Sequence, residues 1–178
     1  KGANHMLDIL DYTKQELIRI FKEYGEEKFA SSIATGIVNA RIKQPIKTTL
    51  ELTEIIKDHV PFKYRKEHHP ARKVFQAIRI EVNHELEVCE SAVKQALDLI
   101  GVGGRVCVIT FHSLEDRIVK KIFKEKSQID ANLKNLPVIP EEYMPSYKII
   151  ANISPTEEEI KENNRARSAR LRVIERIK

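Results

Sequence analysis

Apolar residues recur every three or four positions through the first third of the chain, a spacing that predicts amphipathic helices. One stripe follows Thr13, with Glu16 at the third helical position, and these two residues suit a capping box. Gly25 is expected to end this helix, a second helix follows, and Pro45 closes the segment. The run "TTLELTEIIKDHV" predicts a third helix. These short helices indicate a small helical bundle over roughly residues 7–66.

A single longer helix is predicted from about Pro70 to Ile100. Its apolar positions keep spacings of three and four from Phe75 to Leu97, and Pro70 suits the first helical position. At 1.5 Å per residue this helix would be about 45 Å long, more than a small bundle needs. We therefore expect it to link two structural units. The basic segment "PFKYRKEHHPARK" is expected to be the connection at its start.

The rest of the chain alternates helical patterns with short β-branched runs. "RVCVITF" predicts a buried strand, "SLEDRIVKKIFKEK" a helix, and "YKIIA" and "RLRVIERI" two further strands. The polar run "SPTEEEIKENNRARSAR" is expected to be partly helical. The glycines of "GVGG" precede a strand, whereas a dinucleotide-binding loop follows one. We interpret Gly101, Gly103 and Gly104 as turn residues.

His112 follows the strand Val106 to Phe111, at the end where ligands bind in open α/β sheets. Two interpretations stay open: His112 contributes to a functional site, or it only forms a hydrogen bond in a strand-to-helix turn. Ser113 and Asp116 match the S-x-x-[DE] pattern, so they are predicted to start the next helix. Arg117 is less expected near a helix start and could face a phosphate.

Two groups of basic and polar residues could bind a polynucleotide. Along the predicted long helix, one face carries Arg72, Gln76, Arg79 and Asn83, with His69 and Lys73 near its start. Donor-rich side chains on one face could line an RNA cleft, although a solvated outer face explains the same pattern. Near the end of the chain, four arginines fall within eight residues: Arg165, Arg167, Arg170 and Arg172. Such clusters contact phosphate or solvent, and without interleaved aromatic residues this one is not expected to read bases.

Composition places the chain among soluble globular proteins. Its 178 residues suit one domain with a smaller appendage, 42% are hydrophobic and 32% charged, and no window of 18 consecutive apolar residues suggests a membrane span. No signal peptide is evident. A net charge of +5 permits an anionic partner. The opening "KGANHM", residues 1–6, resembles a cloning junction and is expected to lie outside the fold.

Cysteine and histidine usage favours a reducing compartment and no metal site. Cys89 and Cys107 both fall in apolar patterns, which predicts free buried thiols in the cytoplasm rather than a disulfide. Two cysteines cannot build a zinc site alone, and the six histidines, including the adjacent His68 and His69, show no ligand spacing.

Four segments, in this order and at close spacing, resemble one family: "YGEEKFASSIA", "HPARKVFQAIRIEVNHEL", "GGRVCVITFHSLEDRIVK" and "ENNRARSARLRVIER". They are similar to the ribosomal RNA small subunit methyltransferase H family, also called MraW, over nearly all of residues 12–178. The resemblance implies methylation of the N4 amino group of a cytidine in small-subunit (16S) ribosomal RNA, with S-adenosylmethionine as cofactor. It also implies a Rossmann-like α/β sheet carrying a small all-helical insertion domain.

The resemblance assigns residues 7–68 to the helical insertion and residues 69–178 to the carboxyl-terminal half of the methyltransferase sheet. Val106 to Phe111 would be its fifth strand, with an antiparallel last strand. The family's glycine-rich loop and its acidic cofactor-binding residues have no matching positions here. The chain is therefore expected to bind no S-adenosylmethionine by itself. The strand Val106 to Phe111 would lose its neighbour, so its edge is expected to pair with another chain, as a homodimer or by domain swapping, or to be covered by rearranged segments.

Two main classes of function remain. In the intact enzyme, His112 and Arg117 would shape the cleft near the extruded base. RNA would be held by the remaining candidates, His69, Arg72, Lys73, Arg79, Asn83, Arg165 and Arg167. Alternatively, the chain alone is an RNA-binding or self-associating helical module without catalysis. A third possibility is a domain that only binds other proteins. The sequence identifies no catalytic base.

Overall fold

The computed structural model describes residues 8–67, 69, 71–129, 131–133 and 138–178. The chain forms two compact units, Lys1–Glu85 and Leu86–Lys178. The predictions made for residues 1–6, His68 and Pro70 lie outside the described residues. Within the described part of the chain, no helix is both long enough and apolar enough to cross a membrane.

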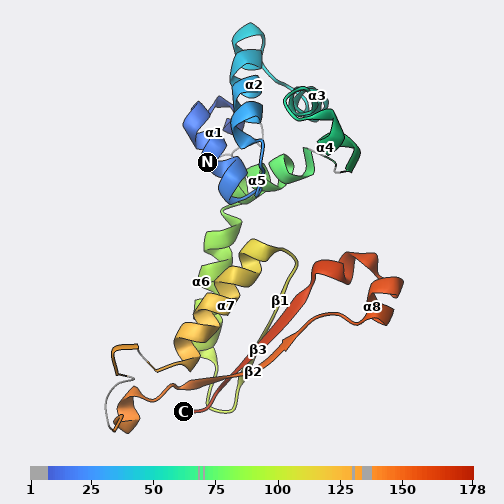
Figure 1. The fold of residues 1–178 in the computed structure, drawn as a ribbon. Coiled ribbons are helices and arrows are strands. Elements are labelled where there is room, and N and C mark those ends of the chain that lie inside the picture. Colours follow the sequence, from blue (N-terminus) through green and yellow to red (C-terminus); the bar gives the residue numbers. More distant parts are fainter. Residues whose placement is uncertain (1–7, 68, 70, 130, 134–137) are drawn as a thin grey trace. The chain divides into compact units, whose positions relative to one another are not determined.

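The first unit is a helical bundle, as the apolar spacing predicted (Figure 1). It contains the 3-10 helix η1 (Asp8–Asp11) and the helices α1 (Lys14–Glu23), α2 (Ala30–Lys43), α3 (Thr49–Asp58), α4 (Phe62–Glu67) and α5 (Ala71–Asn83). Its core is fully buried and aliphatic apart from one ring; the largest members are Leu17, Ile20, Phe21, Ile33, Ile37, Leu52, Ile56 and Ile78. The predicted capping box of Thr13 and Glu16 is confirmed at the start of α1, and α3 begins with a second one, Thr48 with Glu51, which was not predicted. The short helix α4 was not predicted.

The prediction of one long helix is wrong. α5 ends at Asn83 and α6 (Glu85–Leu99) begins after His84, whose φ of 50° lies in the left-handed region. α5 contacts α1 and α3, so it belongs to the first unit. The division between the two compact units therefore falls after Glu85.

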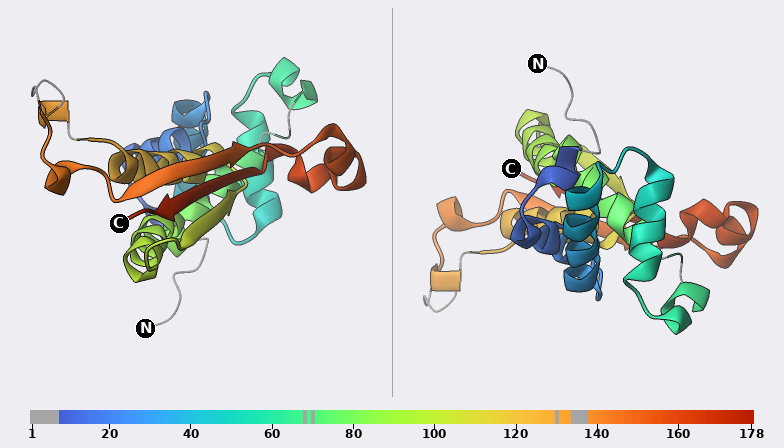
Figure 2. Two further views of the ribbon diagram at one scale, coloured as in Figure 1. Left: turned by 90° about the horizontal axis from the view of Figure 1, so that it is seen from below. Right: turned by 90° about the horizontal axis from the view of Figure 1, so that it is seen from above.

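The second unit packs two helices against one face of a three-stranded sheet (Figures 1 and 2). The strands are β1 (Arg105–Thr110), β2 (Tyr147–Ile153) and β3 (Arg170–Arg176), and the helices are α6 and α7 (Ser113–Ser127). The polar connections carry α8 (Glu157–Glu162) and the 3-10 helices η2 (Ala131–Leu133), η3 (Glu141–Tyr143) and η4 (Asn164–Ser168). The core beneath the helices consists of Val93, Leu97, Val106, Val119, Ile122, Phe123, Tyr147 and Ile174.

The three predicted strands and the antiparallel last strand are confirmed. The strand order is β1-β3-β2, and β3 runs antiparallel to both neighbours, so β1 and β2 run parallel to each other (Figure 2, left). Alternation along β1 buries Val106 and Thr110 toward the helices. Ile109 then lies on the opposite face, in register with Leu171 and, across β3, with Ile153. Ile109 is 60% exposed and Ile153 52%, so this second sheet face is apolar and open in this chain.

β1 is an edge strand whose only partner among the described residues is β3. One expected outcome, that rearranged segments of the same chain cover this edge, is therefore not found in the described part of the chain. Pairing of the edge with another chain stays a prediction.

The two cysteines are free, but the prediction that both are buried is wrong. Cys107 is exposed, because the alternation of β1 places it on the open face of the sheet. Cys89 on α6 is partly buried, and this burial, together with the nearby Glu115 carboxylate, raises the pKa of its thiol.

Candidate functional site

The candidate site lies at the edge of the sheet where β1 and β2 both end. Thr110 at the end of β1 pairs with Arg170, and Ile153 at the end of β2 pairs with Leu171. Because β1 and β2 are parallel, the turn after β1 and the connection between β2 and β3, residues 154–169, emerge at this one edge. Carboxyl ends of parallel strands are the usual place for ligands in α/β sheets.

The turn after β1 is closed by His112, which is the N-cap residue of α7. The N–H of Glu115 donates to Nδ1 of His112 at 3.4 Å. The helix begins at Ser113, as predicted, but the residue that caps it is His112 and not Ser113. Because Nδ1 accepts a hydrogen bond, a neutral ring carries its proton on Nε2.

Glu115 fastens the same turn from its other side. One carboxylate oxygen accepts the N–H of Phe111 at 3.1 Å. The other carboxylate oxygen lies 3.1 Å from Nε2 of His112, but the two atoms are not aligned for a hydrogen bond. Nε2 is buried and has no hydrogen-bond partner among the described residues. The geometry thus supports the interpretation of His112 as a residue that shapes the turn.

Asp116 joins three elements of the second unit rather than capping α7. Its two oxygens accept from Nε and Nη2 of Arg172 at 2.7 and 2.8 Å, and the buried hydroxyl of Thr110 lies 3.4 Å away. The hydrogen bond from Arg172 holds the pKa of Asp116 below its usual value. The side chains of Arg172 and Asp116 are only 12% and 21% exposed. Sequence reasoning missed this pair, because its members lie 56 residues apart and the local S-x-x-[DE] pattern explained Asp116 without it.

Exposed arginines from two segments lie at this edge. Arg117, the fifth residue of α7, is exposed, and its Nε donates to the carbonyl of Ser113 at 3.4 Å. Arg165 and Arg167 lie on η4, within the β2–β3 connection, and both are exposed. The side chain of Arg170 donates to Ser154 at 2.6 Å and so ties the two ends of that connection together. The structure therefore brings Arg165 and Arg167 to the same sheet edge as His112 and Arg117.

The other predicted RNA-binding residues belong to the first compact unit. Lys73 donates to the carbonyl of Glu26 at 3.0 Å. Arg79 forms a two-point ion pair with Glu85 at 2.8 and 3.0 Å, and Asn83 donates to the same carboxylate at 3.1 Å. These three side chains fasten α5 at its two ends. The remaining two, His69 and Arg72, are exposed.

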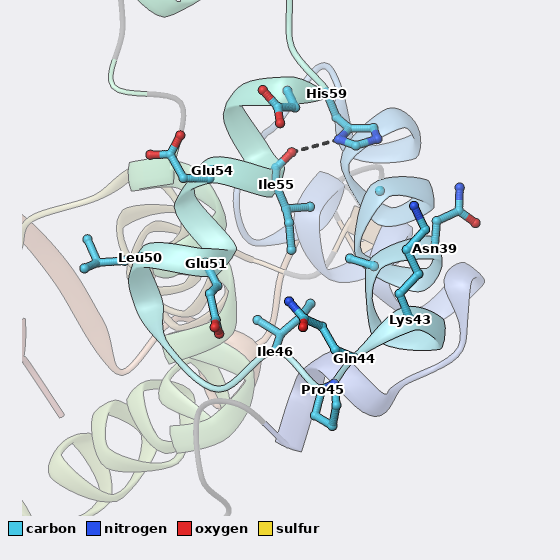
Figure 3. A pocket seen from close by; sticks show the side chains of 13 residues that line it. Asn39, Lys43, Gln44, Pro45, Ile46, Leu50, Glu51, Glu54, Ile55 and His59 are labelled. Carbon is cyan, nitrogen blue, oxygen red and sulfur yellow. Dashed lines mark hydrogen bonds between the residues drawn. The ribbon is translucent and has the colours of Figure 1, made fainter.

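A hollow of about 860 Å³ opens between α2 and α3 in the first unit (Figure 3). Its floor includes Pro45, Ile46 and Ile55, and its rim carries Asn39, Lys43, Gln44, Glu51, Glu54 and Asp58. The ring of His59 closes one end: it contacts Gly36, and its Nδ1 donates to the carbonyl of Ile55 at 2.8 Å. The sequence analysis did not predict this hollow, and it contains none of the predicted site residues.

Among the described residues, no glycine-rich turn follows a strand, where the family resemblance would place the cofactor. A nucleotide-type cofactor needs a glycine-rich turn after a strand. The turn formed by Gly101, Gly103 and Gly104 instead precedes β1, as predicted, at the sheet edge opposite the candidate site. Among the described residues, no three His, Cys, Asp or Glu side chains are grouped to hold a metal ion.

Comparison with known proteins agrees with the motifs. A model of the MraW methylase family matches residues 2–177. The ribosomal RNA small subunit methyltransferase H of Limosilactobacillus fermentum is 53% identical over 171 residues, covering 94% of this chain and 54% of the relative. The protein of the same name from Lactiplantibacillus plantarum is 54% identical over 166 residues, 92% of this chain and 52% of the relative. The chain thus spans about half the length of these curated relatives, and it belongs to the MraW methylase family.

Proposed function

We propose that this chain is the substrate-facing part of an enzyme that methylates the N4 amino group of a cytidine in small-subunit (16S) ribosomal RNA. The observation that carries the proposal is the high identity to named ribosomal RNA methyltransferases over nearly the whole chain. The cations gathered at one sheet edge agree with an RNA substrate. The small ribosomal subunit, and hence the cytoplasm, is the expected place of action.

On this proposal, the β1-β3-β2 sheet is the carboxyl-terminal half of a Rossmann-like sheet, and the helical unit is its insertion domain. The open edge of β1 and the apolar face around Ile109 would then be completed by the part of the longer relatives that this chain does not span. S-adenosylmethionine would bind that other part and supply the methyl group. The chain alone is expected to be inactive.

The residues of this chain would position the RNA rather than move protons. An amino group must leave the base stack to reach a methyl donor, and most of the rate gain comes from holding the two reactants in line. Arg165 and Arg167 would bind phosphates beside the extruded nucleotide. His112, Glu115 and the Asp116–Arg172 pair would hold the turn after β1 rigid. Arg117 would face the substrate from the beginning of α7.

The alternative is a non-catalytic module that binds RNA or associates with itself. The specific observation in its favour is the unpaired edge of β1 beside the exposed Ile109 and Phe111, which could pair with the same edge of a second copy. A homodimer through this edge would leave the exposed Arg165 and Arg167 available to RNA. It would transfer no methyl group.

Methyl transfer separates the two functions. The chain alone, and the chain fused to the preceding part of the Limosilactobacillus fermentum relative, would be incubated with labelled S-adenosylmethionine and unmethylated small subunits. We expect label on one cytidine with the fusion and none with the chain alone. An Arg165→Gln/Arg167→Gln fusion should show a raised KM for the subunit. If the fusion transfers nothing while the intact relative is active in the same assay, the proposal is wrong.

A further inference from the structure

The helix α4 presents an aromatic ring and two lysines on the surface of the first unit. Phe62 is 68% exposed, which is unusual for a residue of this size, and Lys63 and Lys66 are exposed beside it. The ammonium of Lys66 lies 5.1 Å from the centre of the Phe62 ring, one helical turn away. The ring keeps its high exposure with this ammonium in place, so ring surface remains for a ligand.

The inner side of α4 is fixed to the bundle by polar contacts. The hydroxyl of Tyr64 donates to the carboxylate of Glu27 at 3.1 Å, and the Tyr64 ring meets Phe29 edge-on at 5.0 Å. Glu27 is only 2% exposed, and it also accepts the N–H of Phe29. Burial and this carboxylate raise the pKa of Tyr64 to about 12, so the hydroxyl stays a donor at neutral pH. Arg65 adds a hydrogen bond from Nε to the carbonyl of Val60 at 3.2 Å.

The helix is thus held firmly on its inner side, while its outer ring stays largely exposed to solvent. We propose that Phe62, Lys63 and Lys66, the α4 surface, bind a single-stranded segment of RNA. Phe62 would stack on a base, and the two lysines would contact the phosphates on either side. Exposed aromatic rings among cations are the usual means of holding single strands, because every base has a π-face and every linkage a charge. This inference rests on the proposed RNA substrate and names a second contact region for it, on the helical unit.

A tryptophan reporter tests the stacking directly, because the chain contains no tryptophan. Phe62→Trp keeps a stacking ring and makes it the sole tryptophan. Single-stranded RNA should quench its fluorescence, whereas heparin, a polyanion without bases, should not. Ile42→Trp is the matched control: Ile42 is 77% exposed in the same unit but lies beside Asp8 and Asp11, where RNA is not expected. Its fluorescence should stay unchanged.

Two further variants separate stacking from charge. Phe62→Leu keeps an apolar side chain without a ring and should weaken RNA binding about 5- to 100-fold at constant salt dependence. Lys63→Gln/Lys66→Gln should lower the slope of log affinity against log salt by about 1.4, the value for two phosphate contacts with a single strand. The control Lys22→Gln changes an exposed lysine on α1, a helix on the opposite side of α2 from α4 (Figure 1). This variant should leave the RNA affinity unchanged.

The outcomes distinguish the two proposals. If the chain binds RNA but the α4 variants bind as tightly as the parent, the α4 surface is wrong and the proposed RNA substrate stands. Equal quenching of Phe62→Trp by heparin and RNA would contradict base stacking. If the chain binds no single-stranded RNA, the α4 surface is overturned, while methyl transfer by the fusion still decides the proposed function. Circular dichroism of each variant shows whether the bundle is intact. Phe62→Tyr, which keeps a stacking ring, should bind as the parent does, and a large loss of affinity in a folded Phe62→Tyr would also contradict stacking.

Discussion

Replacing Asp116 with alanine is expected to destabilise the sheet unit by about 3 kcal/mol, because it leaves the buried guanidinium of Arg172 without its two-point partner. Amide hydrogen exchange followed by mass spectrometry would localise the effect. Amides of β3 and of the first turns of α7 should exchange on the order of 100-fold faster, while those of the helical unit should keep their protection.

A neighbouring ion pair on the same helix provides the control. Glu125 lies 3.9 Å from Lys121, and both side chains are more than half exposed. Glu125→Ala should change the stability by less than about 0.5 kcal/mol. A comparable loss in both variants would mean that α7 is sensitive to any substitution, and it would contradict the account of the Asp116–Arg172 pair.

The Asp116–Arg172 pair makes the stability of the sheet unit depend on pH. The pKa of Asp116 is lowered in the folded chain, so its contribution to stability is fully present above the unfolded value near 4 and is lost as the pH falls through the folded value. The stability difference between the parent and Asp116→Ala should therefore shrink below about pH 4. A difference that is constant from pH 7 down to pH 3 would be inconsistent with an ionised Asp116.

Replacing Gly25 with alanine is expected to destabilise the helical unit by about 3 kcal/mol. A Cβ at Gly25 would lie 2.7 Å from the carbonyl oxygen of Phe21 and 2.8 Å from that of Lys73. Both atoms are backbone, so α1 and α5 must separate to make room. Urea unfolding followed by circular dichroism would measure the loss of stability. In an amide hydrogen exchange experiment, faster exchange should be confined to α1 and α5.

Gly101→Ala is the matched control for this substitution. No atom lies within 4 Å of a Cβ placed at Gly101. The stability should therefore stay within about 0.5 kcal/mol of the parent. If Gly25→Ala is equally mild, the close approach of α1 and α5 at this glycine is wrong.

Local signals allowed the sequence to predict several elements correctly. Thr13 with Glu16, and the spacing of apolar residues in α1 to α3, carry their information within a few positions, and the structure agrees with them. The same holds for β1, whose β-branched run directly follows the turn glycines, and for the short apolar run of β3. What the sequence could not predict depends on contacts between distant segments.

Three errors show this dependence. The helix break at His84 was hidden because the apolar spacing continues across it from Val82 to Leu86. Ser113 and Asp116 were expected to cap α7 because they match a capping pattern, whereas His112 is the N-cap and Asp116 pairs with Arg172 on β3. The helix α4 looked like a basic connection, because the residue that anchors it, Glu27, lies 37 positions before Tyr64.

Calorimetry with S-adenosylmethionine tests the central claim most directly, that this chain is the substrate-facing half of a methyltransferase without its cofactor site. The titration would use the chain alone, with the intact Limosilactobacillus fermentum relative as the positive control. We expect heat of binding with the relative and none with this chain at millimolar ligand. A micromolar dissociation constant for the chain alone would contradict the account.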